Sequence, residues 1–146
     1  MADSTPVDER AFEQVLIAIK NEDDIVAARG TAREVAKILK FGLVDQSRVA
    51  TAVSELARNI VRYATSGRGE VLVRAVRGTP DGIGIEVVVR DDGPGITDVE
   101  QALAEGYTSG SGMGMGLPGT KRLMDEMEID TAPGRGTTVT IRKWRR

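Results

Sequence analysis

The residues around Asp91 have types and spacing suited to holding a flat aromatic ligand. Asp91 ends a segment rich in Val and Ile, and Gly93 and Gly95 follow it in a D-x-G-x-G pattern. In a strand over 83–91 the other odd-numbered positions are apolar, so the alternation of side chains places Asp91 on the buried face. A buried carboxylate is costly unless a donor satisfies it, as the exocyclic amino group of an adenine can, and glycines let the backbone approach a flat ring. A structural turn in which Asp91 binds its own loop is an equally good interpretation.

A second glycine cluster precedes a predicted helix that begins near Leu117. Its members alternate with other residues: Gly110, Gly112, Gly114 and Gly116. Backbone N–H groups and a helix N-terminus together form an anion site that suits a triphosphate, which the alternation favours over a mobile linker. The string over 114–119 formally matches the dinucleotide fingerprint, but no strand precedes it, which excludes a Rossmann interpretation. A protein-kinase glycine loop is excluded because no catalytic-loop signature follows, and no Walker A sequence is present.

Glu55 and Asn59 are four residues apart on a predicted helix, so their side chains lie one above the other beside its apolar stripe. An asparagine oxygen can complete the shell of a magnesium ion held by ATP and water. A neighbouring glutamate can accept the proton of an attacking hydroxyl or water. Alone, Glu55 is typical of a solvated helix residue, whereas the two glycine clusters favour the role of a base.

Thr137 could reach the adenine side of Asp91, although a turn before a Thr-rich strand is the alternative.

The composition excludes several function classes. The chain has 146 residues, a formal charge of −2 and 40% hydrophobic residues, which predicts one domain over 1–146. It contains neither Cys nor His, which excludes disulfides, thiolate or imidazole chemistry and the common zinc sites. Few aromatic residues and an acidic pI near 5.3 argue against nucleic acid as a partner.

We expect a flexible N-terminus over 1–10. We also expect no membrane association and a cytoplasmic location, because no stretch approaches a membrane span.

Hydrophobic periodicity predicts the order β, α, α, β, β, loop, α, β, β. The first strand is expected over 12–20, a helix from its cap Asn21 to Gly42, and a second helix from its cap Asp45 to about Ser66. Two strands over 70–77 and 83–91 form a hairpin, a long loop over 93–116 is expected to act as a lid, and a helix covers 117–127. The last strands cover 129–131 and 137–143, and the basic end over 142–146 is expected to be a solvated strand end without function. The fold class is therefore an α/β sandwich with helices on one face of a mixed, largely antiparallel sheet.

Four motifs in this order resemble the boxes of the GHKL ATPases. The N box is Glu55-Leu-Ala-Arg-Asn59, the G1 box is Asp91-Asp-Gly93-Pro-Gly95, the G2 box is 112–116, and the last box is Gly136-Thr137. Together they cover nearly the whole folded chain, which makes the set far more specific than any single glycine pattern. Within that superfamily, the short chain, the absent histidine-bearing helix and the string GMGMGLPGTKRLMDE resemble the stressosome switch kinases of the anti-sigma-factor kinase group.

The resemblance implies a Bergerat fold with an ATP lid, Mg²⁺ and ATP as cofactors, and phosphate transfer to Ser or Thr of STAS-domain stressosome proteins. It further implies that the released kinase binds and activates a downstream serine phosphatase. By motif, Glu55 is the base, Asn59 the magnesium ligand, Asp91 the adenine partner and Thr137 a support of the adenine pocket. The G1 glycines Gly93 and Gly95 and the glycines over 110–116 contact the nucleotide, the latter as the phosphate cradle.

One departure from the family concerns the γ-phosphate. Related anti-sigma kinases place an arginine at the edge of the lid, but no Lys or Arg occurs here between Arg90 and Lys121. Lys121, Arg122, magnesium or a residue of the substrate must then supply the positive charge. A nucleotide-gated module that sequesters a regulator without phosphotransfer is the competing interpretation. An ATPase clamp would need further domains, and a histidine kinase could be present only as an isolated catalytic domain.

Overall fold

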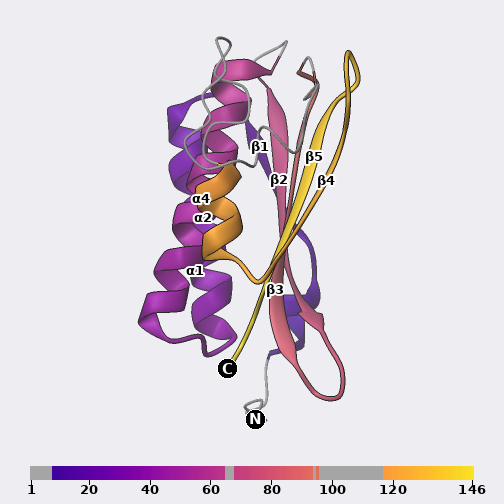
Figure 1. The fold of residues 1–146 in the computed structure, drawn as a ribbon. Helices are drawn as coiled ribbons and strands as arrows, with labels where there is room; N and C mark the ends of the chain where they lie inside the picture. The colour runs from indigo at the N-terminus through magenta and orange to yellow at the C-terminus, as the bar shows by residue number, and fades with distance from the viewer. Residues whose placement is uncertain (1–7, 65–67, 94, 96–116) are drawn as a thin grey trace.

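The computed structural model describes residues 8–64, 68–93, 95 and 117–146. Within them the chain forms two layers, with the α-helices together on one side of a sheet (Figure 1). The helices are η1 (Glu9–Phe12), α1 (Glu22–Ile38), α2 (Leu43–Tyr63) and α4 (Leu117–Leu123). The strands are β1 (Val15–Ile19), β2 (Gly69–Arg77), β3 (Ile83–Asp91), β4 (Glu126–Ala132) and β5 (Gly136–Trp144).

The sheet has the order β1-β2-β3-β5-β4. Every neighbouring pair of strands is antiparallel. The predicted α/β sandwich, the order of its helices and strands in the described residues and the hairpin of β2 and β3 are therefore confirmed, with a wholly antiparallel sheet among the described strands. Val73, Val87 and Ile141 are fully buried on the face that the helices cover. No helix of the described part has the length and apolar character needed to cross a bilayer.

The two long helices begin differently from one another. Asn21 caps α1 as predicted, because its side chain accepts a hydrogen bond from the backbone N–H of Asp24 at 3.2 Å. The prediction that Asp45 caps α2 is wrong, since the cap is Gly42 and Asp45 lies in the first turn. There its carboxylate suits the helix dipole and pairs with Arg48 at 3.0 Å.

The first strand is shorter than the predicted 12–20. Phe12 ends the 3₁₀ turn η1, and the strand begins only at Val15. Asp8 caps that turn by accepting from the backbone N–H of Arg10 at 2.9 Å. Of the segment over 1–10, the structure thus describes 8–10 as part of this turn, and 1–7 lie outside the described residues.

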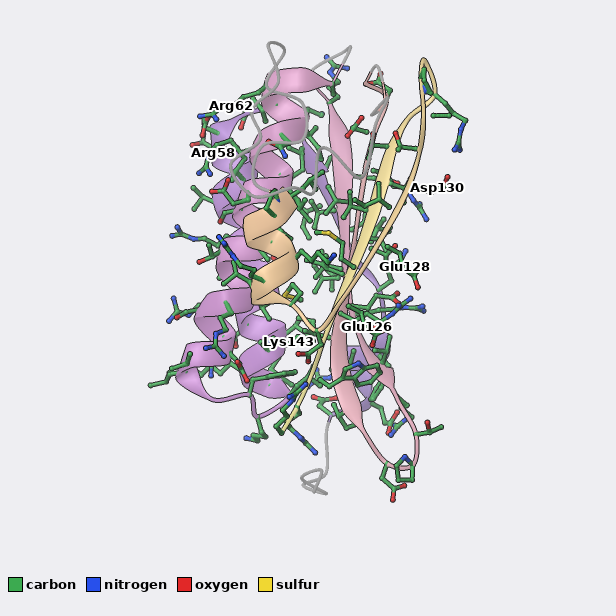
Figure 2. The ribbon with its side chains drawn as sticks, in the orientation of Figure 1. Arg58, Arg62, Glu126, Glu128, Asp130 and Lys143 are labelled. Carbon is green, nitrogen blue, oxygen red and sulfur yellow. The ribbon has the colours of Figure 1, made fainter. Side chains whose placement is uncertain are left out.

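The prediction of a helix to Met127 is wrong, because α4 ends at Leu123 and β4 begins at Glu126. Acidic side chains alternate with apolar ones along β4, and Met127 and Ile129 pair with Ile141 and Val139 of β5. Figure 2 shows the acidic side chains Glu126, Glu128 and Asp130 following one another along this strand. The alternation of side chains every two residues and the backbone pairing with β5 specify a strand. They outweigh the helical spacing of Met124 and Met127.

The basic C-terminal end is also not the solvated strand end that we expected. Lys143 and Arg145 are 7% and 4% exposed. Lys143 Nζ donates to the carbonyl of Leu123 at 2.9 Å, and Arg145 Nη1 donates to the carbonyl of Leu39 at 2.9 Å. Both carbonyls end helices, where backbone acceptors lack a partner within the helix. The C-terminal strand therefore ties α1 and α4 to the sheet.

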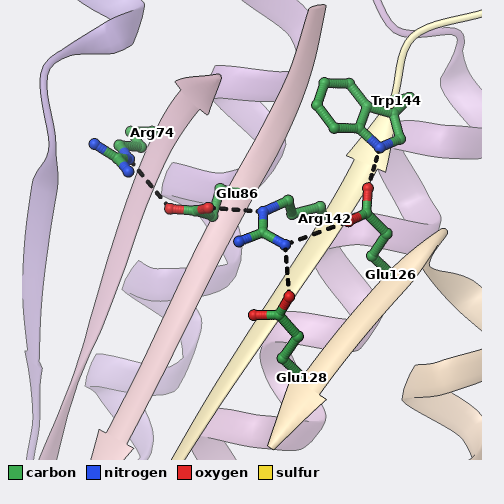
Figure 3. A network of polar contacts seen from close by, with 6 residues as sticks. All are labelled: Arg74, Glu86, Glu126, Glu128, Arg142 and Trp144. Carbon is green, nitrogen blue, oxygen red and sulfur yellow. Dashed lines mark hydrogen bonds and ion pairs between the residues drawn. The ribbon is translucent and has the colours of Figure 1, made fainter. Parts of the chain in front are cut away.

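On the uncovered face, a row of charged side chains crosses four strands (Figure 3). Glu86 on β3 accepts from Arg74 of β2 at 3.2 Å and from Arg142 of β5 at 2.8 Å. Arg142 also reaches Glu126 of β4 at 3.3 Å, and the indole N–H of Trp144 donates to the same glutamate. These partners explain why Glu86 is only 8% exposed on a face that no helix covers.

The turn between β4 and β5 yields a paired stability test. Gly136 has φ of +84°, and a Cβ there would lie 2.3 Å from the carbonyl oxygen of Asp91. Gly136→Ala should therefore lower the free energy of unfolding by about 2 kcal/mol or more. Gly30→Ala is the control, because nothing lies within 4 Å of that position in α1, and it should raise stability by up to about 1 kcal/mol. Urea unfolding of both variants measures this, and equal midpoints would contradict a backbone clash at position 136.

Candidate functional site

The carboxyl end of β3 and the second half of α2 meet at one end of the molecule. Ile60 of α2 lies over Gly69, where a Cβ would come within 2.9 Å of the Ile60 side chain. Gly69 is in turn the partner of Asp91 across β2 and β3. Asn59 precedes Ile60 directly, so the structure brings the N-box helix and the predicted adenine partner to the same end of the sheet.

The carboxyl group of Asp91 is partly buried and bound by backbone amides. Its Oδ1 accepts from the N–H of Gly93 at 2.7 Å. This is the hydrogen bond expected from the alternative in which Asp91 binds its own loop. Loss of solvent raises the pKa of Asp91 above its ordinary value of 3.8, and the amides of Gly93 and Thr137 oppose that rise only in part. A carboxylate has about four acceptor positions, so one more donor, such as an exocyclic amino group, would relieve the remaining cost.

Thr137 lies directly opposite Asp91 in the pairing of β3 with β5. Its hydroxyl is 2.9 Å from the hydroxyl of Thr131, which itself donates to the carbonyl of Gly136 at 3.0 Å. Because the single proton of Thr131 serves that carbonyl, Thr137 is the donor between the two threonines. Thr137 is thereby fixed beside Asp91, with its amide turned to the carboxyl group.

The glycines of the G1 motif have a reason in the fold itself. Gly95 has φ of +80°, and a Cβ there would lie 2.1 Å from the carbonyl oxygen of Ala132 at the end of β4. Gly93 is buried. Close packing of the chain against β4 thus requires glycine at 95 without any ligand, which the sequence pattern alone did not reveal.

Glu55 and Asn59 are both half-buried on α2, about 6 Å apart along the helix axis. Glu55 is not simply solvated, because its Oε1 accepts from Arg58 Nη1 at 3.0 Å. Sequence analysis missed Arg58, although its spacing of three residues from Glu55 is a usual signal for a helical ion pair. Figure 2 shows Arg58 and Arg62 on the same part of the helical layer.

The predicted phosphate cradle cannot be located in the described structure. Gly110, Gly112, Gly114 and Gly116 lie outside the described residues, as does most of the predicted lid. Lys121 and Arg122, the two candidate cations of the chain, are exposed on α4, which packs against α2.

The donor set of the described residues suits a magnesium ion that arrives with ATP. No group of three or more carboxylate, imidazole or thiolate side chains that could hold an ion by itself occurs in the described part. Magnesium bound to ATP keeps phosphate and water ligands and needs only one or two from the protein. An asparagine amide oxygen is a ligand of that kind, and the half-buried Asn59 lies next to the residue that packs over Gly69.

Comparisons with known proteins show the family to which the chain belongs. Residues 44–146 match the family described as histidine kinase-, DNA gyrase B-, and HSP90-like ATPase. The serine/threonine-protein kinase RsbT of Bacillus subtilis is 46% identical over 136 residues, which cover 92% of this chain and 98% of that protein. An anti-sigma F factor of Clostridium beijerinckii is 32% identical over 127 residues, which cover 85% and 87% of the two chains.

Two solved structures share the fold. The RsbU and RsbW domains of a Mycobacterium tuberculosis protein match with a TM-score of 0.58 at 18% identity, over 92% of this chain and 33% of that chain. A mycobacterial sensor histidine kinase, MprB, matches with a TM-score of 0.53 at 23% identity, over 92% and 99% of the two chains. The predicted Bergerat fold is thereby confirmed. The chain belongs to the histidine kinase-, DNA gyrase B- and HSP90-like ATPases and, within them, to the RsbT-like serine/threonine kinases of the anti-sigma-factor kinase group.

Proposed function

We propose that this chain transfers the γ-phosphate of Mg-ATP to a Ser or Thr of STAS-domain stressosome proteins in the cytoplasm. The observation that carries the proposal is the meeting of the N-box helix with the end of β3, through Ile60 and Gly69. It brings the helix that carries the candidate base and the candidate metal ligand to the strand end that carries the candidate adenine partner. The extensive similarity to RsbT supports the same conclusion.

In the proposed reaction, the hydroxyl oxygen of the acceptor attacks the γ-phosphorus, and the bond from that phosphorus to the β,γ-bridging oxygen breaks. Glu55 takes the hydroxyl proton, and ADP leaves with the bridging oxygen. Arg58 holds Oε1 of Glu55, so the second oxygen is available for the proton. Magnesium, held in part by Asn59, would neutralise charge on the phosphates.

Binding of the nucleotide base is assigned to Asp91, supported by Thr137. Two backbone amides already engage the carboxyl group, which fixes its direction before a ligand arrives. Gly93 and Gly95 belong to the same pocket in this proposal, and Gly110, Gly112, Gly114 and Gly116 form the phosphate cradle. The adenine base and the triphosphate of the nucleotide are thus held by two separate parts of the chain.

A second activity follows from the family resemblance. On release from its substrates, the kinase would bind and activate a downstream serine phosphatase. The competing function is that of a binding module that sequesters a regulator without transferring phosphate, and the similarity to anti-sigma F factors supports it. Kinase and binding module need the same nucleotide pocket and differ in their need for Glu55.

The first prediction separates these functions. Glu55→Gln should lower the rate of phosphate transfer to a STAS protein by about a hundredfold or more, because the amide cannot accept the proton. Its affinity for ATP should stay within about twofold of wild type. Glu34→Gln, at an exposed position of α1, is the matched control and should behave as wild type. Transfer at the wild-type rate by the Glu55 variant would exclude this residue as the base.

The second prediction concerns Asp91. Asp91→Asn should weaken ATP binding about tenfold or more, because the carboxylate is the stronger acceptor for an amino group.

Since the pKa of Asp91 is raised by folding, the folded chain holds the proton more tightly than the unfolded chain. This carboxyl therefore contributes stability below pH 3.8 that is lost as the pH rises through the higher pKa of the folded state. Urea titrations at several pH values should show that decline in wild type, and an identical profile for the variant would contradict it.

The third prediction concerns the missing lid arginine. If a residue of the substrate supplies the cation at the γ-phosphate, the isolated chain should hydrolyse ATP negligibly, and addition of a STAS protein should raise ADP release at least about a hundredfold. A coupled assay with and without the STAS protein measures this. Equally fast turnover without the substrate would show that the chain supplies its own cation.

A further inference from the structure

An exposed apolar groove lies on the first half of α2, on the N-terminal side of Glu55. It has a volume of about 370 Å³ and is lined by Leu43, Val44, Ser47, Arg48, Thr51 and Leu123. Leu43 and Val44 are 74% and 64% exposed. Leu123 comes from α4, which lies along α2 (Figure 1). Two adjacent apolar side chains with so little cover at the mouth of a groove mark a contact surface.

The surroundings of the groove are basic. Arg48 lines it, Lys121 and Arg122 precede Leu123 on α4, and Lys40 ends the turn between α1 and α2. These basic residues outnumber the nearby acidic residues Asp45, which pairs with Arg48 at 3.0 Å, and Asp125, which pairs with Arg146 at 3.1 Å. An apolar groove with a positive rim fits an amphipathic helix whose apolar side chains are flanked by carboxylates.

The groove and the candidate base share one face of α2. Val44, Arg48, Thr51 and Glu55 succeed one another at spacings of three or four residues, which align them in a single stripe. The rise of an α-helix places Glu55 about 6 Å beyond Thr51 and about 17 Å beyond Val44. A protein held in the groove therefore presents its neighbouring surface to Glu55.

We propose that this groove docks an acidic amphipathic helix of the protein that is phosphorylated. The inference rests on the proposed kinase function and extends it by giving the substrate a second binding site. Docking makes the approach of the acceptor hydroxyl to Glu55 an intramolecular step, which raises its effective concentration. The groove thus determines the affinity for the protein substrate, whereas the nucleotide pocket determines the rate of phosphate transfer.

Steady-state kinetics with the full chain and a STAS protein test the proposal. The double variant Leu43→Glu, Val44→Glu places charge at the mouth of the groove, where exposed positions tolerate it. We expect at least a tenfold higher KM for the STAS protein, with kcat and ATP affinity within twofold of wild type. Val26→Glu is the matched control, because Val26 is an apolar residue of α1 that is 61% exposed. An unchanged KM in the double variant, or an equal rise in the control, would overturn the proposal.

A second pair of variants tests the charge of the rim. Arg48→Glu should raise KM for the STAS protein at least threefold, whereas Arg33→Glu, at an exposed position of α1, should leave it unchanged. Equal effects of the two reversals would show a general charge effect and contradict docking at the groove.

Direct binding keeps this proposal separate from the kinase function. The affinity of the STAS protein for each variant is measured by calorimetry without ATP. If wild type binds the STAS protein through the groove but transfers no phosphate, docking holds and the proposed kinase function fails. If wild type transfers phosphate and the groove variants bind as wild type does, the kinase function holds and docking fails. Absence of both binding and transfer would overturn docking as well.

Discussion

Close approach of three backbone segments around the end of β3 is the constraint on which the site depends. Side chains at 69, 95 and 136 would lie 2.3, 2.1 and 2.3 Å from the backbone carbonyl oxygens of Arg90, Ala132 and Asp91. Glycine at these positions lets β2, β5 and the loop after β3 pack where Asp91 emerges. The contacts are made without a ligand, so the pocket geometry belongs to the fold. In the proposed function, a nucleotide base would meet a backbone around Asp91 that is already in place.

The same packing leaves Asp91 with an unfavourable environment. Two amides hold its carboxyl group, yet loss of solvent still outweighs them and raises its pKa. A carboxyl group whose burial costs free energy in the free protein, and which can accept a hydrogen bond from a ligand, is typical of a binding site. This carboxyl group stands at the end of a strand, in a sheet that is apolar on one face and joined by ion pairs on the other.

Helix α2 connects the parts of the molecule that the proposed function uses. Its buried stripe packs on the sheet, its second half carries Glu55 and Asn59 and meets the end of the sheet through Ile60, and its first half lines an apolar groove with α4. Because a helix is stiff over this length, a partner bound along it has a fixed relation to Glu55. One rigid element can in this way couple the selection of a protein partner to the position of the reacting groups.

The sequence by itself determined the features that depend on local pattern. Periodicity predicted the element order and the hairpin, Asn21 marked the start of α1, and the ordered boxes identified the family. It did not determine the end of α4, because the alternation over 126–130 becomes decisive only when β5 pairs with it. The burial of Arg145 likewise depends on the carbonyl of Leu39, 106 residues away in the chain. Local spacing encodes helix and strand, whereas the partners that bury a charge or extend a sheet are brought in only by the tertiary fold.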